Sequence, residues 1–124
     1  MPGKKAEPVS ARAKPVARGV RRLAEAERFC KRFARLTGMR ARSPDTEGLP
    51  REFLARQVFS PEMLLQRYGR ELETRTCNAL HRYEPGPTRA PWTYGRLLEI
   101  RGFGVFSLLD LLEVLHRHAT RTLE

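Results

Sequence analysis

The chain has 124 residues, which is the usual size of one domain or of a small domain with a tail. Its formal net charge is +10, but residues 1–43 hold 13 basic and 3 acidic side chains, whereas residues 44–124 hold 11 of each. This argues against a uniformly basic globule. It predicts a neutral domain behind a basic arm, a distribution typical of proteins that bind polyanions.

The composition excludes membrane-spanning and disulfide-framework proteins. No window approaches 18 consecutive apolar residues, and no apolar region follows the N-terminal lysines, so neither a transmembrane helix nor a secretory signal is predicted. Cys30 and Cys77 are too few for a disulfide framework or a four-cysteine zinc site. We expect two thiols in a reducing compartment.

The basic arm divides into a tail and a helix. Residues 1–18 mix proline, glycine, alanine and basic residues without apolar periodicity, so a disordered tail is predicted. In residues 19–37, apolar side chains recur every three or four positions, which predicts an amphipathic helix ending at Gly38: Val20, Leu23, Ala26, Phe29 or Cys30, Phe33 and Leu36. Residues 19–43 thus form a helix and a linker.

Three interpretations of this helix remain open. Its apolar stripe can dock on the following domain while its basic face is solvated. The basic face can also bind phosphates. The same pattern further permits a membrane-surface helix or an organelle presequence, although the acids and prolines of the arm weaken that interpretation.

The middle segment, residues 44–70, is expected to extend the core. Ser43, Pro44, Gly48 and Pro50 indicate a linker and turn, and a short helix is predicted around Phe53. Ser60, Pro61 and Glu62 then form a typical helix start, and Gly69 ends that helix.

A helix is predicted from about Thr74 to Tyr83. Arg75, Asn78 and Arg82 share one of its faces, because they are spaced by three and four residues. An arginine guanidinium can form two parallel hydrogen bonds to a phosphate, and an asparagine amide can bond a phosphate, a sugar or a base edge. The alternative is an ordinary solvated face.

Residues 97–108 have the form of a helix-hairpin-helix turn. A short helix ends at Ile100, and the chain reverses through Gly102 and Gly104, where a positive φ or a close backbone approach requires glycine. Phe103 is expected to fill the core of the hairpin. Ser107 is predicted to cap the next helix, with Asp110 completing a capping box, and the free N–H groups of Gly104 to Ser107 suit a phosphate oxygen.

Together, Leu72-Glu-Thr-Arg-Thr-Cys-Asn-Ala-Leu80 and Leu97-Leu-Glu-Ile-Arg-Gly-Phe-Gly-Val-Phe-Ser-Leu-Leu-Asp-Leu-Leu112 resemble the C-terminal domain of the bacterial RNA polymerase α subunit. The resemblance covers about 45 of the 124 residues, within a module at 71–118. Members of that family bind A·T-rich promoter DNA across the minor groove. The resemblance implies that Arg75 enters the groove, that Asn78 makes a second contact with Arg82 at its flank, and that the backbone is held by Gly102, Gly104 and Ser107.

Three departures from the family pattern stand out. Phe106 occupies the place of a lysine before the serine, and Glu73 replaces a serine two residues before the arginine. Residues 84–91 contain three prolines and cannot form the family's second helix. The chain also has too few residues for the subunit's assembly domain, so the resemblance implies a free-standing relative.

The last predicted helix is apolar almost all round. Leu108, Leu111, Leu112 and Leu115 face one way, Leu109 and Val114 add apolar surface elsewhere, and Glu113 is expected to pair with Arg117. Such a helix needs two neighbours. The 19–37 helix is one candidate, and a partner protein or a second copy is the other.

No catalytic chemistry is predicted. His81, His116, His118 and the cysteines lack metal-ligand spacing, and no nucleophile–base pair or nucleotide loop is present, so no enzyme activity, metal or cofactor is expected. Trp92 can stack a base, but we expect it to pack under its loop.

The sequence therefore predicts an all-α, compact helical bundle over residues 44–124 with a helix-hairpin-helix motif. We expect a transcription-related protein of the bacterial cytoplasm, associated with the nucleoid, that binds duplex DNA, with no membrane contact. The alternative is a protein-interaction module that docks on RNA polymerase or a transcription factor through Phe106, Leu109 and Val114. The oligomeric state is left open.

Overall fold

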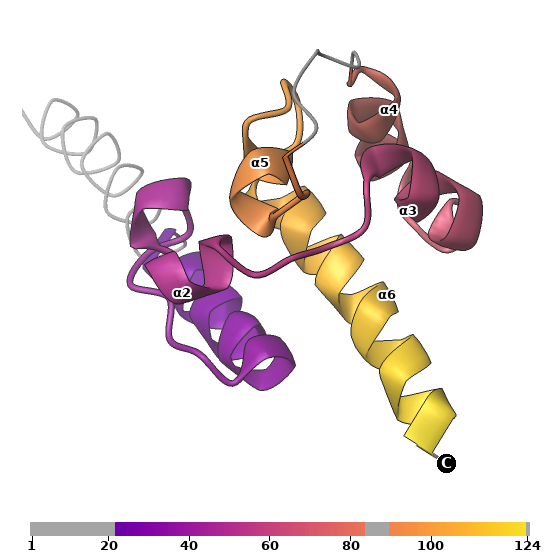
Figure 1. The fold of residues 1–124 in the computed structure, drawn as a ribbon. Helices are drawn as coiled ribbons and strands as arrows, with labels where there is room; N and C mark the ends of the chain where they lie inside the picture. The colour runs from indigo at the N-terminus through magenta and orange to yellow at the C-terminus, as the bar shows by residue number, and fades with distance from the viewer. Residues whose placement is uncertain (1–21, 84–89, 124) are drawn as a thin grey trace, which may run out of the picture.

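The computed structural model describes residues 22–83 and 90–123 (Figure 1). The elements in chain order are the N-terminal helix (residues 22–37), the 3-10 helix η1 (Thr46–Gly48), α2 (Arg51–Leu54), α3 (Pro61–Tyr68), α4 (Thr74–His81), α5 (Tyr94–Leu98) and α6 (Val105–Leu123). Over these residues the only strand-like pairing is a single bridge between Gln57 and Thr93, so the all-α class is confirmed. The predicted tail at 1–18 and the segment 84–89 lie outside the described residues.

The N-terminal helix docks on the rest of the chain, as the first interpretation of its pattern predicts. Phe29 and Phe33 are buried, and Phe33 packs edge-on against Phe53 of α2 with ring centroids 4.9 Å apart. Leu23, also expected on the buried stripe, is 68% exposed because the helix runs past the core at that end. The helix ends at Gly38, whose φ of 73° confirms the predicted cap. None of the described helices is long and apolar enough to cross a bilayer.

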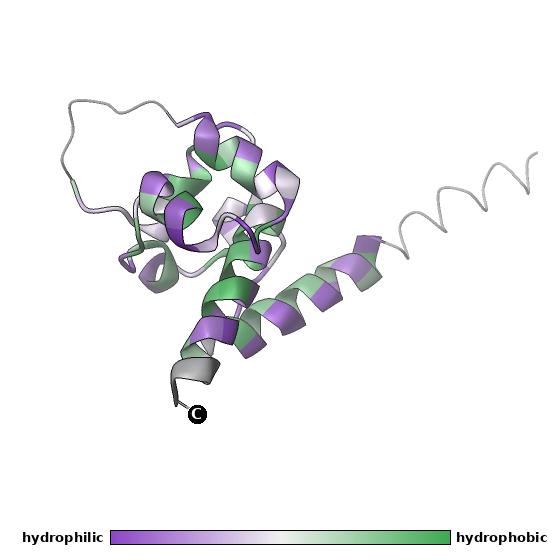
Figure 2. Cartoon of the chain, turned by 90° about the vertical axis from the view of Figure 1, so that its right-hand side faces the viewer, coloured by the Kyte–Doolittle hydropathy of each residue, from purple (hydrophilic) through white to green (hydrophobic). Residues whose placement is uncertain are grey.

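Helix α6 supplies the centre of the core. Figure 2 shows hydrophobic residues along the part of α6 that the other elements surround. Six hydrophobic side chains of α6 belong to the buried core: Val105, Leu108, Leu109, Leu111, Leu112 and Val114. The N-terminal helix covers one side of α6, and α4 packs on another. The two neighbours that this apolar helix requires are therefore both supplied by the chain itself.

Local capping places α3 and α4. The Ser60 hydroxyl accepts the N–H of Met63 at 3.3 Å, and Pro61 opens α3, which confirms the predicted start. In α4, Thr76, Ala79 and Leu80 face the core. The opposite face, with Arg75, Asn78 and Arg82, is exposed, as the spacing predicts.

The turn between α5 and α6 differs from the prediction in one respect. Phe103 is buried and fills the turn as expected, but α6 begins at Val105, two residues before the predicted cap at Ser107. The carbonyl of Gly104 already accepts the N–H of Leu108 at 3.0 Å, so Ser107 lies inside the first turn and faces the core, only 3% exposed. The capping box of Ser107 and Asp110 is therefore wrong. Asp110 instead accepts the N–H of Glu73 at 2.8 Å, at the start of α4.

Candidate nucleic-acid interface

The predicted site residues other than the buried Ser107 gather on one exposed face, which also takes in two arginines of the N-terminal helix. We call it the arginine face and define it as Arg28, Arg32, Arg75, Asn78, Arg82, Gly102, Gly104 and Phe106. Three separate segments build it: the N-terminal helix, the outer face of α4, and the turn that leads into α6.

Arg82 joins α4 to the turn before α6. Gly102 has a φ of +88°, a conformation that side chains rarely adopt. A Cβ built at Gly102 would lie 2.9 Å from Nη1 of Arg82 and 3.8 Å from Cβ of Ala79. Glycine is therefore favoured here by its φ, while the Arg82 guanidinium, at the end of a flexible side chain, lies against the turn. Two residues that were predicted from separate motifs are thus in contact.

Arg75 joins α4 to the first turn of α6. Its guanidinium carbon lies 6.0 Å from the centroid of the Phe106 ring, and its Nε lies 3.2 Å from a carboxylate oxygen of Glu73. The side chains of both Arg75 and Glu73 are more than half exposed. An exposed ion pair of this kind contributes little to the free energy of folding, so a phosphate can compete with Glu73 for Arg75.

Phe106 continues the face toward the N-terminal helix. Phe106 is 47% exposed, and its ring meets the ring of Phe29 edge-on, with centroids 5.9 Å apart. A shallow pocket of about 160 Å³ lies beside it, lined by Glu25, Arg28, Phe29, Arg32, Phe106 and Leu109. Phe106 therefore stands between Arg75 on one side and Arg28 with Arg32 on the other.

The start of α6 provides backbone donors on the same face. Helix geometry leaves the N–H groups of Val105, Phe106 and Ser107 without acceptors inside the helix. Gly104, which precedes them, is exposed, and a Cβ built there would meet nothing within 4 Å. Unlike Gly102, Gly104 has no positive φ, so the turn itself does not require glycine at this position. The side chain of Ser107 is buried and can contribute only its backbone N–H.

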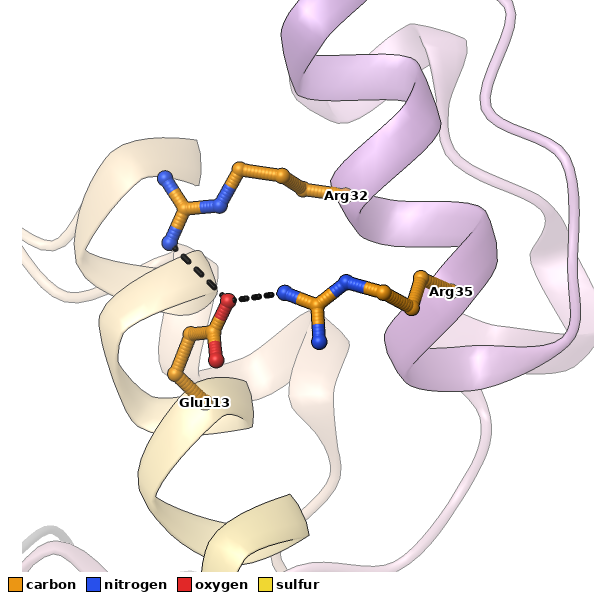
Figure 3. A network of polar contacts seen from close by, with 3 residues as sticks. All are labelled: Arg32, Arg35 and Glu113. Carbon is orange, nitrogen blue, oxygen red and sulfur yellow. Dashed lines mark hydrogen bonds and ion pairs between the residues drawn. The ribbon is translucent and has the colours of Figure 1, made fainter.

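A carboxylate of α6 holds the N-terminal helix beside this face (Figure 3). Oε1 of Glu113 accepts hydrogen bonds from Nη2 of Arg32 at 3.2 Å and from Nη2 of Arg35 at 2.5 Å. Partial burial is the largest single effect on Glu113 and opposes its ionisation. The two arginine hydrogen bonds together outweigh burial and lower the pKa of this carboxyl. The predicted pairing of Glu113 with Arg117 is therefore wrong. Arg117 instead lies 3.9 Å from Glu71.

Sequence reasoning missed the contribution of Arg28 and Arg32 to this face. Both lie beside the buried stripe of the N-terminal helix, but no local pattern shows which face of α6 the helix will meet. The available signal was the spacing of the two arginines around Phe29 and Phe33, which form the buried stripe. Three carboxylates lie beside the arginines of this face: Glu25 lines the pocket with Arg28 and Arg32, Glu113 pairs with Arg32, and Glu73 pairs with Arg75.

The remaining candidates take structural positions. Trp92 is half-buried, with the guanidinium carbon of Arg96 4.0 Å from the centroid of its ring and the Tyr83 ring packed edge-on against it. It therefore packs within the chain, as expected. The thiol of Cys77 donates to the carbonyl of Gly69 at 3.3 Å, and burial together with Asp110 raises its pKa. His118 contacts Glu71 and the Tyr68 ring. Within residues 22–83 and 90–120, no three His, Cys, Asp or Glu side chains gather as a metal site would require.

Comparison with known proteins adds no relative: no family model matches the chain, and neither the curated proteins nor the solved structures contain a match.

Proposed function

We propose that this chain is a DNA-binding protein and a free-standing, divergent relative of the C-terminal domain of the bacterial RNA polymerase α subunit. In this proposal the α5–α6 turn is a helix-hairpin-helix motif. The protein acts in transcription, in the nucleoid of a bacterial cytoplasm, and catalyses no reaction. It binds duplex DNA through the arginine face, while its basic N-terminal residues add affinity that does not depend on sequence.

One observation carries the proposal. The contacts of Arg82 with Gly102 and of Arg75 with Phe106 join the two motifs on which the resemblance depends into one exposed face. These motifs are about 25 residues apart in the sequence, and each alone has an ordinary structural interpretation. Such a face presents arginine guanidinium groups beside free backbone N–H groups. Both kinds of donor can bind the phosphates on the two sides of a minor groove.

Each part of the face has a role in this proposal. The N–H groups at the start of α6 bind one phosphate, and the open space at Gly104 lets the DNA backbone approach. Arg75 enters the minor groove, Asn78 follows one turn later on α4, and Arg82 contacts the flank. A·T-rich duplex is preferred because its narrow minor groove concentrates negative potential and attracts arginine.

The test is fluorescence anisotropy with labelled A·T-rich and G·C-rich duplexes at near-physiological salt. We expect Arg75→Ala to weaken binding to the A·T-rich duplex by about tenfold or more, and to reduce the preference for it. Glu73→Gln should strengthen binding, because it frees Arg75 and removes a negative charge from the face. Arg51→Ala is the matched control: it removes another exposed arginine, from α2, outside the arginine face.

Two results would contradict the proposal. If Arg75→Ala and Arg51→Ala weaken binding equally, only the total charge matters and the face does not recognise DNA. If the unmodified chain does not bind duplex at moderate salt, the protein-interaction alternative is favoured. Of the three apolar residues assigned to that alternative, Leu109 and Val114 are buried within the chain and only Phe106 is exposed.

A further inference from the structure

Phe106 is an exposed aromatic side chain in an arginine-rich setting. The described residues include three other exposed large hydrophobic side chains: Leu23, Phe59 and Met63. Phe59 is covered in part by the guanidinium of Arg67, 4.7 Å above its ring. Phe106 is different because arginines lie on both sides of it, with Arg75 on α4 and with Arg28 and Arg32 on the N-terminal helix.

The ring of Phe106 is supported from below. It stands edge-on to Phe29, which is buried and stacks on Phe33 with centroids 6.2 Å apart. Phe33 in turn packs against Phe53 at 4.9 Å. This row of rings connects Phe106 to the core, and the bonds of Glu113 to Arg32 and Arg35 hold the N-terminal helix in place. Because protein interiors are close-packed, the ring cannot sink into the core beneath it.

We infer that Phe106 is a wedge that inserts between two base pairs from the minor groove and bends the DNA. This inference rests on the proposed function and adds an architectural activity to it. Proteins that bend DNA from the minor groove insert an apolar side chain at one base step and use cations to hold the phosphates on either side. The arrangement on the arginine face has both parts: a supported apolar ring and arginines to its two sides.

The wedge also accounts for the residue type at position 106. An exposed cation there would add one phosphate contact, whereas a phenyl ring adds none. The part of the ring that Phe29 leaves exposed can pack on an apolar surface of a partner, and the faces of unstacked bases are such a surface. The cost of unstacking one step is offset by the extra phosphates that a bent duplex brings to Arg28, Arg32 and Arg75.

The test uses the full chain and an A·T-rich duplex that carries a donor and an acceptor dye at its ends, with 2-aminopurine placed at successive steps of a second duplex. Energy transfer reports the bend, 2-aminopurine fluorescence reports unstacking, and anisotropy reports binding. The variants are Phe106→Ala, Phe106→Leu and, as a matched exposed aromatic, Phe59→Ala. Circular dichroism checks that each variant is folded.

We expect the unmodified chain and Phe59→Ala to bend the duplex by an angle in the range of about 20–90° and to raise 2-aminopurine fluorescence at one step. Phe106→Ala should still bind at low salt but lose both signals, and Phe106→Leu should keep both, because leucine is also an apolar wedge.

Each other outcome overturns the inference in a distinguishable way. Binding of the unmodified chain without a bend overturns the wedge and leaves DNA binding standing, as does an equal bend with Phe106→Ala. Failure of the unmodified chain to bind overturns both. Phe106-dependent binding to vesicles of anionic phospholipid, with no bend in the duplex, would assign the ring to a membrane surface instead.

Discussion

At the residue scale, Glu113 is the carboxylate that connects the N-terminal helix to α6. Its side chain is 24% exposed, and its partners Arg32 and Arg35 are about half exposed. Solvent therefore weakens the ion pairs, and we expect them together to contribute about 1 kcal/mol to the free energy of unfolding. Their position matters more than their strength, because they fix the side of the helix that carries Arg28 and Arg32 toward Phe106.

The lowered pKa of Glu113 predicts how this contribution depends on pH. A carboxyl whose pKa is lowered by folding stabilises the fold fully above its ordinary value of 4.5, and the contribution is lost as the pH falls through the folded pKa. Glu113→Gln should therefore lower the unfolding free energy by about 1 kcal/mol at pH 7 and by progressively less in acid. Urea denaturation over a pH series measures this difference.

The control for this prediction is Glu27→Gln, which removes an exposed carboxylate from the N-terminal helix itself. It should change the unfolding free energy by less than about 0.5 kcal/mol. A difference between Glu113→Gln and the unmodified chain that persists unchanged at low pH would contradict the electrostatic explanation and assign the effect to packing.

At the element scale, Asp110 connects α6 to the start of α4. Glu73 is the N-cap residue of α4, but its side chain forms no capping hydrogen bond. Instead, its backbone N–H donates to the carboxylate of Asp110 at 2.8 Å. A negative charge is also favourable near a helix N-terminus. The cap of α4 is therefore supplied by a residue 37 positions away, and this contact orients the helix that carries Arg75 and Asn78.

Asp110→Ala should lower the unfolding free energy by about 1 kcal/mol, as the loss of a helix cap does, and should reduce amide hydrogen-exchange protection in α4 more than in α3. Glu27→Ala, which removes an exposed carboxylate from inside the N-terminal helix, is the control. If protection falls equally in both helices, Asp110 supports the whole bundle rather than the orientation of α4.

The same contact explains which parts of the fold could be predicted from the sequence. Local signals were reliable where the partners are close in the chain, as with Ser60 and Met63 at the start of α3 or Gly38 after the N-terminal helix. They were misleading where a side chain had both a local and a distant partner available. Asp110 and Glu113 have spacings typical of a capping box and an i,i+4 ion pair, but both bond to other helices.

At the scale of the whole molecule, the uneven charge does not coincide with a division of the fold. The helix over residues 22–37 holds five basic and two acidic residues of the basic arm, but its Phe29 and Phe33 belong to the same core as α6. A truncation at residue 43 would therefore remove core residues and damage the domain. Residues 1–21, with six basic residues and one acidic residue, can be removed without taking any buried side chain of the described core.

Deletion of residues 1–21 should weaken DNA binding and make its logarithmic dependence on salt concentration shallower, because fewer counterions are released. The preference for the A·T-rich duplex should be retained, since it belongs to the arginine face. Anisotropy titrations at several salt concentrations measure both quantities. An unchanged salt dependence with a lost A·T preference would place recognition in the N-terminal residues instead.

The candidate site was predictable in part for a physical reason. Arg75, Asn78 and Arg82 share a face through helix periodicity alone, so their alignment follows from the sequence. Their meeting with Gly102 and Phe106 depends on how α4 packs on α6, and the positions of Arg28 and Arg32 depend on how the N-terminal helix docks. Such packing is decided by tertiary contacts, which a linear pattern does not contain.

The most direct measurement of the central claim, that the arginine face binds DNA, is a titration of the isotope-labelled chain with A·T-rich duplex, followed by amide nuclear magnetic resonance. We predict that the largest shifts fall on the amides of Arg75, Asn78, Gly102, Gly104 and Phe106, with smaller shifts at Arg28 and Arg32. Shifts confined to residues 1–21, or centred on α2 and α3, would contradict the claim.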